Sequence, residues 1–315
     1  MRALHFDGTV PRVTELPLPE PSEDSALVRV VLAGICNTDL ELLKGYMGFR
    51  GILGHEFVGV VDQGPSEWRD QRVVGEINFA CQDCPMCQEN LQRHCPDRRV
   101  MGILNADGAF AEIVRVPIAN LHIVPDSVPD EVAVFAEPLA SAFEILSQVD
   151  VEPGGDCLVL GDGKLGILVA QVLDAVGARV LVVGNHRDKL AILERRGIET
   201  VLTSDWVPQP TPLVVEATGS AEGFERALAA TKSRGILVLK STSAERRGIN
   251  LAPIVINEIQ IVGSRCGPFP PALSAMEADT IDVRSLISQR VPLRDGNEAL
   301  RRAADPSQLK VLIEP

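Results

Sequence analysis

Four cysteines in one short stretch have the spacing of a metal site. They follow the pattern C-x-x-C-x-x-C-x₇-C at Cys81, Cys84, Cys87 and Cys95. Four thiolates in one loop can close a tetrahedral zinc site with no open position, which stabilises a fold and does no chemistry. Four free buried thiols are the alternative, but so dense a cluster disfavours it, and the acidity of the chain disfavours a nucleic-acid zinc ribbon. We therefore predict structural zinc here.

A second set of residues could hold zinc with one position left open for a substrate. Cys36 lies in the sequence G-I-C-N-T-D, and His55 and Glu56 lie in G-H-E-F-V-G. Thiolate and imidazole are ligands that suit zinc. Glu56 could be the third ligand or a neighbouring carboxylate, and Glu137, in A-E-P-L-A, competes for the same place. A lone cysteine or histidine is more often part of a core, but their occurrence beside the four-cysteine loop favours a catalytic zinc.

A glycine-rich turn in the middle of the chain indicates a dinucleotide. The sequence G-D-G-K-L-G matches G-x-G-x-x-G between an apolar run, 157–160, and an apolar helix that ends near Gly177. The glycines allow a tight turn, close approach of the backbone to a pyrophosphate, and close packing of helix on strand. A turn without a ligand is the alternative, which this context disfavours. The candidate contacts are Gly161, Gly163, Lys164, Leu165 and Gly166.

The next predicted strand favours NADP over NAD. NAD-binding proteins carry an acid at the end of this strand, where it accepts the ribose hydroxyls. Here Gly184 takes that place, which leaves room for a 2′-phosphate. Asn185, His186 and Arg187 follow directly and could bind the phosphate, and Lys189 is a further candidate. The alternative is that Arg187 only begins a solvated helix.

The elements that must position these residues divide into three stretches. Residues 1–125 contain short alternating runs and predict a β-rich domain. Residues 126–265 alternate buried strands with helices, which predicts a doubly wound parallel sheet. Residues 266–315 are too few for a domain and are expected to complete the first one. Strand ends of such a sheet face the ligand crevice, so Ser264 and Arg265 could touch cofactor or an anionic substrate group, although Arg265 is equally well a surface charge.

Composition limits the class of function. The chain has 315 residues, more than one core usually organises, and a net charge of −13 with a pI of about 4.9. This acidity argues against nucleic acid and anionic membranes as partners. No apolar stretch is long enough to span a bilayer, and the amino terminus lacks a signal-peptide core, so we expect a cytoplasmic protein.

The ordered motifs together resemble the zinc-containing alcohol dehydrogenases of the medium-chain dehydrogenase/reductase superfamily. The E-P-L-A element is most similar to the polyol, sorbitol and threonine dehydrogenase branch. The resemblance implies a β-rich GroES-like catalytic domain beside a Rossmann domain. The motifs that carry it are G-I-C-x-T-D at 34–39, G-H-E-x-x-G at 54–59, the cysteine spacing at 81–95, E-P-L-A at 137–140 and G-x-G-x-x-G at 161–166.

The resemblance implies two zinc ions per chain and hydride transfer between a small-molecule alcohol or carbonyl and NAD(P). It implies a catalytic zinc bound by Cys36 and His55, with either Glu56 or Glu137 as the third protein ligand. Thr38 matches the hydroxyl that bonds the zinc-bound alcohol and starts its proton relay. Many relatives carry a histidine where this chain has Glu41, so the relay could run through Glu41, cofactor hydroxyls or water. A homodimer or homotetramer is expected.

Two other classes of protein fit less well. A catalytically silent NADP-binding protein of this fold would be expected to lack the zinc ligands, and a zinc-independent quinone or enone reductase would lack the cysteine loop and the Cys36–His55 pair. The motifs therefore predict an enzyme acting on a secondary alcohol or polyol-type hydroxyl, or on its ketone or aldehyde, while no motif names the substrate.

Overall fold

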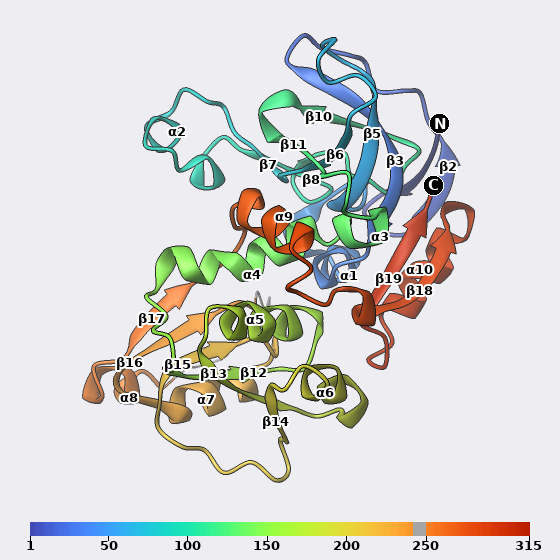
Figure 1. Cartoon of the computed structure of the whole chain (residues 1–315). Coiled ribbons are helices and arrows are strands. Elements are labelled where there is room, and N and C mark those ends of the chain that lie inside the picture. The colour runs from blue at the N-terminus through green and yellow to red at the C-terminus, as the bar shows by residue number, and fades with distance from the viewer. Residues whose placement is uncertain (242–249) are drawn as a thin grey trace. The chain divides into compact units, whose positions relative to one another are not determined.

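The computed structural model describes residues 1–241 and 250–315, which form two compact units (Figure 1). The first unit comprises Met1–Glu137, Phe269–Ala278 and Val283–Pro315. The second comprises Pro138–Pro268 and Asp279–Asp282. The predicted fold class, a Rossmann domain together with a β-rich domain, is confirmed.

The main sheet of the first unit has seven strands. Their order is β11-β6-β5-β3-β19-β18, and β10 pairs with β3. The carboxyl-terminal β19 pairs antiparallel with β3, with Leu312 opposite Gly34, so the end of the chain is part of the sheet that carries the first candidate zinc ligands. The strands are β3 (Ser25–Gly34), β5 (Glu56–Gln63), β6 (Arg72–Gly75), β10 (Ile113–Pro117), β11 (Leu121–Ile123), β18 (Ile287–Pro292) and β19 (Lys310–Glu314).

Two small sheets complete the strands of this unit. One has the order β2-β1-β4, and the other has the order β7-β8-β9. Their fully buried side chains include Leu4, Phe6 and Met101, which belong to the apolar core. The strands are β1 (Arg2–Phe6), β2 (Pro11–Glu15), β4 (Gly51–Ile52), β7 (Asn78–Phe79), β8 (Arg99–Met101) and β9 (Asn105–Ala106).

The helices of the first unit are short. Among them, α3 contacts β3, β5 and α9, which is why the first unit continues to Glu137, beyond the predicted boundary at residue 125. The α-helices are α1 (Asn37–Leu43), α2 (Pro85–Gln88), α3 (Asp130–Ala133), α9 (Phe269–Glu277) and α10 (Gly296–Ala303). Single 3₁₀ turns occupy Tyr46–Gly48, Gln92–His94, Ile118–Asn120, Arg284–Leu286 and Leu293–Asp295.

The second unit is built on one parallel sheet of six strands in the order β14-β13-β12-β15-β16-β17. The strand order reverses between β12 and β15, which is where such sheets bind their ligands. The strands are β12 (Asp156–Leu160), β13 (Arg179–Gly184), β14 (Glu199–Leu202), β15 (Thr211–Glu216), β16 (Thr231–Leu239) and β17 (Gln260–Gly263). The helices are α4 (Ala136–Gln148), α5 (Lys164–Ala175), α6 (Arg187–Glu194), α7 (Ala221–Ala230) and α8 (Ala252–Ile256).

Apolar side chains on the sheet explain why these segments form buried strands. Leu158, Val214 and Leu237 pack in one cluster with Ala227 and Leu228 of α7. Helix α5 is buried along its whole middle, and it contacts β12 and β13. Strands of a parallel sheet are covered on both faces and therefore consist of near-continuous apolar runs, as these strands do. The glycine turn between β12 and α5 is therefore held by a packed scaffold.

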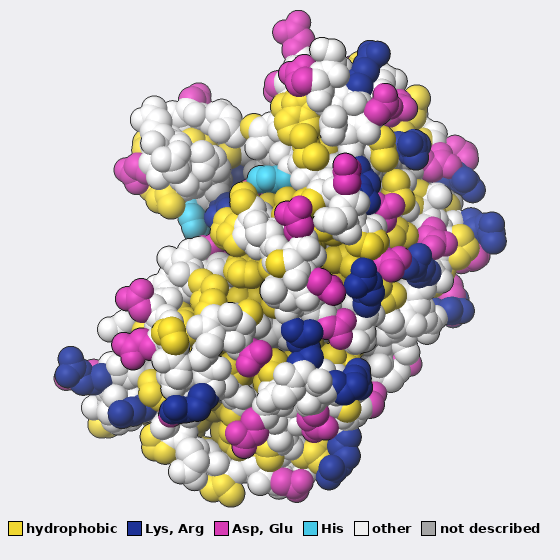
Figure 2. Space-filling view, viewed as in Figure 1, with side chains coloured by type: hydrophobic (Ala, Val, Ile, Leu, Met, Phe, Trp, Pro, Cys, Tyr) yellow, Lys and Arg dark blue, Asp and Glu magenta, His cyan; other side chains and the backbone are white. Residues whose placement is uncertain are grey.

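The surface carries charges of both signs. On the face that Figure 2 shows, acidic and basic side chains are interspersed over both units. No helix within residues 1–241 and 250–315 is both long and apolar enough to cross a membrane.

Candidate active site

Cys36 stands at the start of α1, where one buried carboxylate fixes its position. It is the N-cap of that helix, and Asp39 Oδ2 accepts a hydrogen bond from the Cys36 backbone N–H at 2.8 Å. The other oxygen of Asp39 accepts from the N–H of Gly54 at 3.2 Å. Asp39 therefore ties the turn that carries Cys36 to the segment that carries His55.

Three of the predicted ligands come together in the first unit. Cys36, His55 and Glu56 each offer one ligand atom, and these atoms lie within 4.8 Å of one another. His55 and Glu56 are buried. Oε1 of Glu56 is buried without a hydrogen-bond partner among residues 1–241 and 250–315. Leaving a charged buried acceptor unpaired is costly, so this group fits a bound cation.

The electrostatics of His55 lead to the same conclusion. Burial by itself would lower the pKa of His55, but the Asp39 carboxylate and Cys36 outweigh it and hold the pKa well above its usual range. Nδ1 of His55 lies 3.3 Å from Oδ1 of Asp39. Nδ1 has no hydrogen-bond partner among residues 1–241 and 250–315, so Asp39 acts on the ring through its charge. The surroundings of His55 thus favour positive charge at this place.

Lys310 was missed by sequence reasoning, and it neutralises one side of Glu56. Its Nζ forms a buried ion pair with Oε2 of Glu56, and it lies 3.3 Å from the carbonyl oxygen of Ile35. Lys310 and Glu56 are each 1% exposed. The pair occupies one carboxylate oxygen and leaves Oε1 available. No local motif could have found Lys310, because 254 residues separate it from Glu56.

The other residues predicted for this site are placed differently. Glu137, in the first turn of α4, is not a member of the three-residue group among the described residues. Oγ1 of Thr38 lies 3.8 Å from Sγ of Cys36. Glu41 lies one turn after Thr38 on α1, and its carboxylate pairs with Lys44 at 2.7 Å on the surface.

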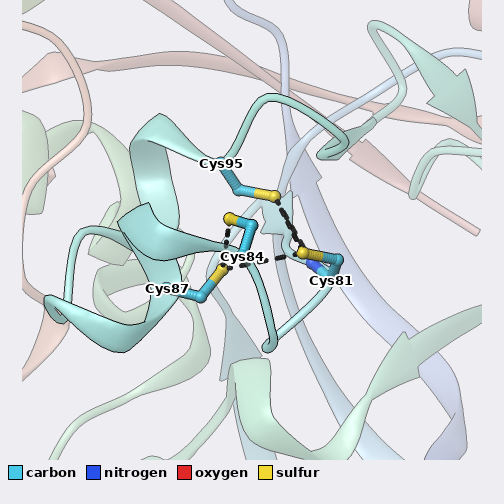
Figure 3. A group of neighbouring side chains, drawn as sticks. All are labelled: Cys81, Cys84, Cys87 and Cys95. Carbon is cyan, nitrogen blue, oxygen red and sulfur yellow. Dashed lines mark hydrogen bonds between the residues drawn. The ribbon is translucent and has the colours of Figure 1, made fainter.

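The four cysteines of the second cluster converge as predicted from their spacing (Figure 3). Sγ of Cys84 lies 3.5 Å from that of Cys87, and Sγ of Cys95 lies 3.5 Å from that of Cys81. Zinc–sulfur bonds of 2.3 Å in a tetrahedron would place the sulfurs about 3.8 Å apart. The loop that carries α2 extends away from the strands of its unit (Figure 1). These distances suit a closed zinc site.

The chemistry of these thiols also favours a cation. None of the four forms a disulfide. Burial and the neighbouring Cys84 thiol raise the pKa of Cys87 to about 12, so Cys87 by itself is a neutral thiol at neutral pH. Zinc supplies the charge that makes thiolates stable in such a cluster. A zinc ion bound by these four thiolates would hold the α2 lobe together.

In the glycine turn, two glycines are required by the fold and one leaves space. Gly161 has φ +120°, and a Cβ there would lie 2.7 Å from the carbonyl oxygen of Ala217. A Cβ on Gly166 would lie 2.0 Å from the carbonyl oxygen of Gly161. Gly163, the N-cap of α5, would meet nothing within 4 Å. The open space at Gly163 fits a pyrophosphate, since the N–H groups of the first turn of α5, which begins at Lys164, point toward the start of that helix.

The end of β13 contains a residue that sequence reasoning missed. Oδ2 of Asp162 accepts hydrogen bonds from the backbone N–H groups of Asn185 and His186 at 2.7 and 2.6 Å. The side chain of Arg187, predicted to bind a phosphate, is 81% exposed and lies 4.0 Å from Asp205. Lys189 is buried on α6. The feature of the sequence that could have indicated its role is the position of this acid between the first two glycines of the turn.

Ser264 and Arg265 take part in a network around a buried lysine. Lys240 Nζ donates to the hydroxyl of Ser264 at 3.1 Å and to the carbonyl oxygens of Ser141 and Arg265 at 2.6 and 3.1 Å. The Ser141 hydroxyl also donates to Arg265 O at 2.7 Å. This network joins α4 to the chain that follows β16 and β17. Lys240 therefore has a structural role that accounts for its burial.

Comparison with known proteins identifies the family of both parts of the chain. Residues 22–126 match the alcohol dehydrogenase GroES-like domain, and residues 165–279 match the zinc-binding dehydrogenase family. D-altritol 5-dehydrogenase of Agrobacterium fabrum is 29% identical over 320 residues, which are 95% of each chain.

Two solved structures share the whole architecture. A zinc-binding dehydrogenase of Sinorhizobium meliloti, bound to NADP, is 29% identical with a TM-score of 0.91 over 100% of this chain and 99% of its own. An alcohol dehydrogenase of Escherichia coli, in complex with NADH, is 25% identical with a TM-score of 0.92 over the same shares. The chain therefore belongs to the zinc-containing alcohol dehydrogenases of the medium-chain dehydrogenase/reductase superfamily and is an NAD(P)-dependent oxidoreductase of alcohols.

Proposed function

We propose that the protein interconverts a secondary hydroxyl of a polyol-type substrate and its ketone, with a catalytic zinc held by Cys36, His55 and Glu56. The observation that carries this proposal is the free, buried Oε1 of Glu56 beside the Cys36–His55 pair. Glu137 is outside this group, so we assign the third protein ligand to Glu56. A zinc ion held by this thiolate, imidazole and carboxylate would have three protein ligands and could still bind the substrate oxygen.

In this proposal, residues of α1 move the proton of the substrate hydroxyl to solvent. Zinc, when bound, supplies a Lewis acid that lowers the pKa of the substrate hydroxyl. Thr38, whose hydroxyl lies 3.8 Å from the Cys36 sulfur, accepts the substrate proton. Glu41 lies one turn later on the same side of α1 and reaches solvent beside Lys44. We propose that Glu41 receives the proton from Thr38, directly or through water.

The cofactor is bound by the second unit. Gly161, Gly163 and Gly166 shape the turn, and the first N–H groups of α5 receive the pyrophosphate. The sequence prediction of NADP over NAD depended on Gly184 and Arg187. Asp162 occupies the space beside Gly184, so the absence of a side chain there does not by itself favour NADP.

Metal analysis with an activity panel tests the proposal. We expect two zinc ions per chain, and one in the variant Cys95→Ser, which removes a buried ligand of the structural site. That variant should lose thermal stability, since the exposed lobe depends on its metal. Turnover is measured with secondary alcohols, polyols and amino alcohols. Zinc-free protein that still turns over an alcohol would overturn the catalytic assignment, and one zinc that disappears in Cys95→Ser would leave only the structural site.

We also propose that the protein is a homodimer or homotetramer built through the β17 edge of the parallel sheet. β17 is an edge strand, and the preceding α8 exposes Val255 and Ile256 at 75% and 77%. An apolar edge of this kind is usually covered. Light scattering after gel filtration should give at least twice the 33.9 kDa of one chain. Ile256→Asp should lower that mass, and an unchanged mass would place the interface elsewhere.

A further inference from the structure

Asp162 links the glycine turn to the end of the next strand. It lies between Gly161 and Gly163, and the residue is 6% exposed. Its Oδ2 accepts from the N–H groups of Asn185 and His186 at 2.7 and 2.6 Å and lies 3.0 Å from Nδ1 of His186. Since His186 is the N-cap of α6, this carboxylate accepts from the two N–H groups that directly precede the first turn of that helix.

The carboxylate stands where a side chain at the end of β13 would stand. A Cβ added to Gly184 would lie 2.5 Å from Cβ of Asp162 and 2.6 Å from its Oδ2. NAD-binding Rossmann proteins present an acid from that strand end to the ribose hydroxyls. In this chain the strand end is glycine, and the turn supplies a carboxylate to the same place.

This arrangement opposes a 2′-phosphate in two ways. The N–H groups of Asn185 and His186 lie directly after the end of β13, and Asp162 accepts from both of them, so neither is available to a phosphate. A phosphate beside a buried carboxylate would also be repelled, and like charges brought together strongly disfavour a ligand. Arg187, the expected phosphate-binding cation, instead lies beside Asp205. The space that the missing side chain of Gly184 leaves is therefore filled by a carboxylate and does not accommodate a phosphate.

We propose that Asp162 sets the cofactor preference of the enzyme, by serving from the glycine turn as the ribose-binding carboxylate and thereby selecting NAD(H) over NADP(H). Oδ1 is the oxygen that can bind a ribose hydroxyl, since it accepts from neither backbone N–H group and lies 3.2 Å from Nδ1 of His186, while Oδ2 binds the backbone. The inference depends on the proposed function only in that a nicotinamide dinucleotide binds the second unit. It reverses the preference expected from the sequence.

The test is equilibrium binding, which needs no turnover. Dissociation constants are measured by calorimetry for NADH and NADPH, and for the fragments 5′-AMP and 2′,5′-ADP, which contain only the adenosine part. We expect the wild type to bind NADH at least about tenfold more tightly than NADPH, with the same order for the fragments. Asp162→Asn removes the charge and keeps the shape, so it should reduce this ratio about tenfold or more.

Asp188→Asn is the matched control. It removes an exposed carboxylate from the first turn of the same helix, so it should leave the ratio of the two dissociation constants unchanged. Tighter binding of NADPH or 2′,5′-ADP by the wild type would overturn the inference, whether or not Asp162→Asn folds. An unchanged ratio in folded Asp162→Asn would overturn it too. Absence of turnover with every alcohol, while the fragments bind in the expected order, would instead count against the proposed function.

Discussion

Replacing Cys36 with serine is expected to lower kcat/KM for the alcohol substrate by about a thousandfold or more, because the catalytic zinc is lost. A serine hydroxyl does not replace a thiolate as a zinc ligand at neutral pH. The fold should remain, because Cys36 caps α1 and serine is among the best residues at that position. Metal analysis should find one zinc fewer per chain, while circular dichroism should match that of the wild type.

Cys157→Ala provides the comparison for this experiment. Cys157 is buried in β12 and belongs to neither of the two groups of candidate zinc ligands. The variant should therefore keep both metals and nearly all activity. Cys95→Ser should lose the other zinc, so the two serine variants separate the two sites. A Cys36→Ser enzyme that retains turnover, or that retains both zinc ions, would mean that the catalytic metal is bound elsewhere.

The parallel sheet could be predicted because its strands are apolar runs. The apolar run 157–160 predicts a strand, and β12 occupies Asp156–Leu160. β16 is the exception, since it begins at Thr231 with the polar sequence Thr-Lys-Ser-Arg-Gly. Its exposed residues, Lys232 to Arg234, give no apolar signal, and β15 pairs with β16 only at Thr231 and again from Ile236. In the first unit, several strands have only two residues, which is too few for any pattern to locate.

The metal ligands could be predicted because their types and local spacing are themselves the signal. The residues that neutralise or position the functional groups could not be predicted from the sequence. Lys310 reaches Glu56 only because β19 pairs with β3, and Asp162 reaches Asn185 only because β12 and β13 are neighbours. Such contacts arise from the tertiary structure. The local sequence therefore predicts an empty space beside Gly184, whereas Asp162 fills that space in the structure.

The buried pair of Lys310 and Glu56 leads to the second large effect. Lys310→Met keeps an apolar stem of similar length and removes the ammonium. Glu56 would then be a buried carboxylate without its cation, which is expected to lower the free energy of unfolding of the first unit by about 3–5 kcal/mol. This loss should be seen in chelator-treated protein. With zinc present it should be smaller, because the metal compensates the charge of Glu56.

Denaturant unfolding of the first unit measures this effect. Trp68 lies in the first unit and Trp206 in the second, so a Trp206→Phe background lets the fluorescence of Trp68 report on the first unit alone. The double variant Lys310→Met/Glu56→Gln should recover most of the stability, because replacing both members of a buried pair removes the uncompensated charge. It should not recover zinc at the catalytic site, since an amide is a poor substitute for the carboxylate ligand. A loss below about 1 kcal/mol in Lys310→Met, or an equal loss with and without zinc, would show that Glu56 does not depend on Lys310 and zinc for its charge balance.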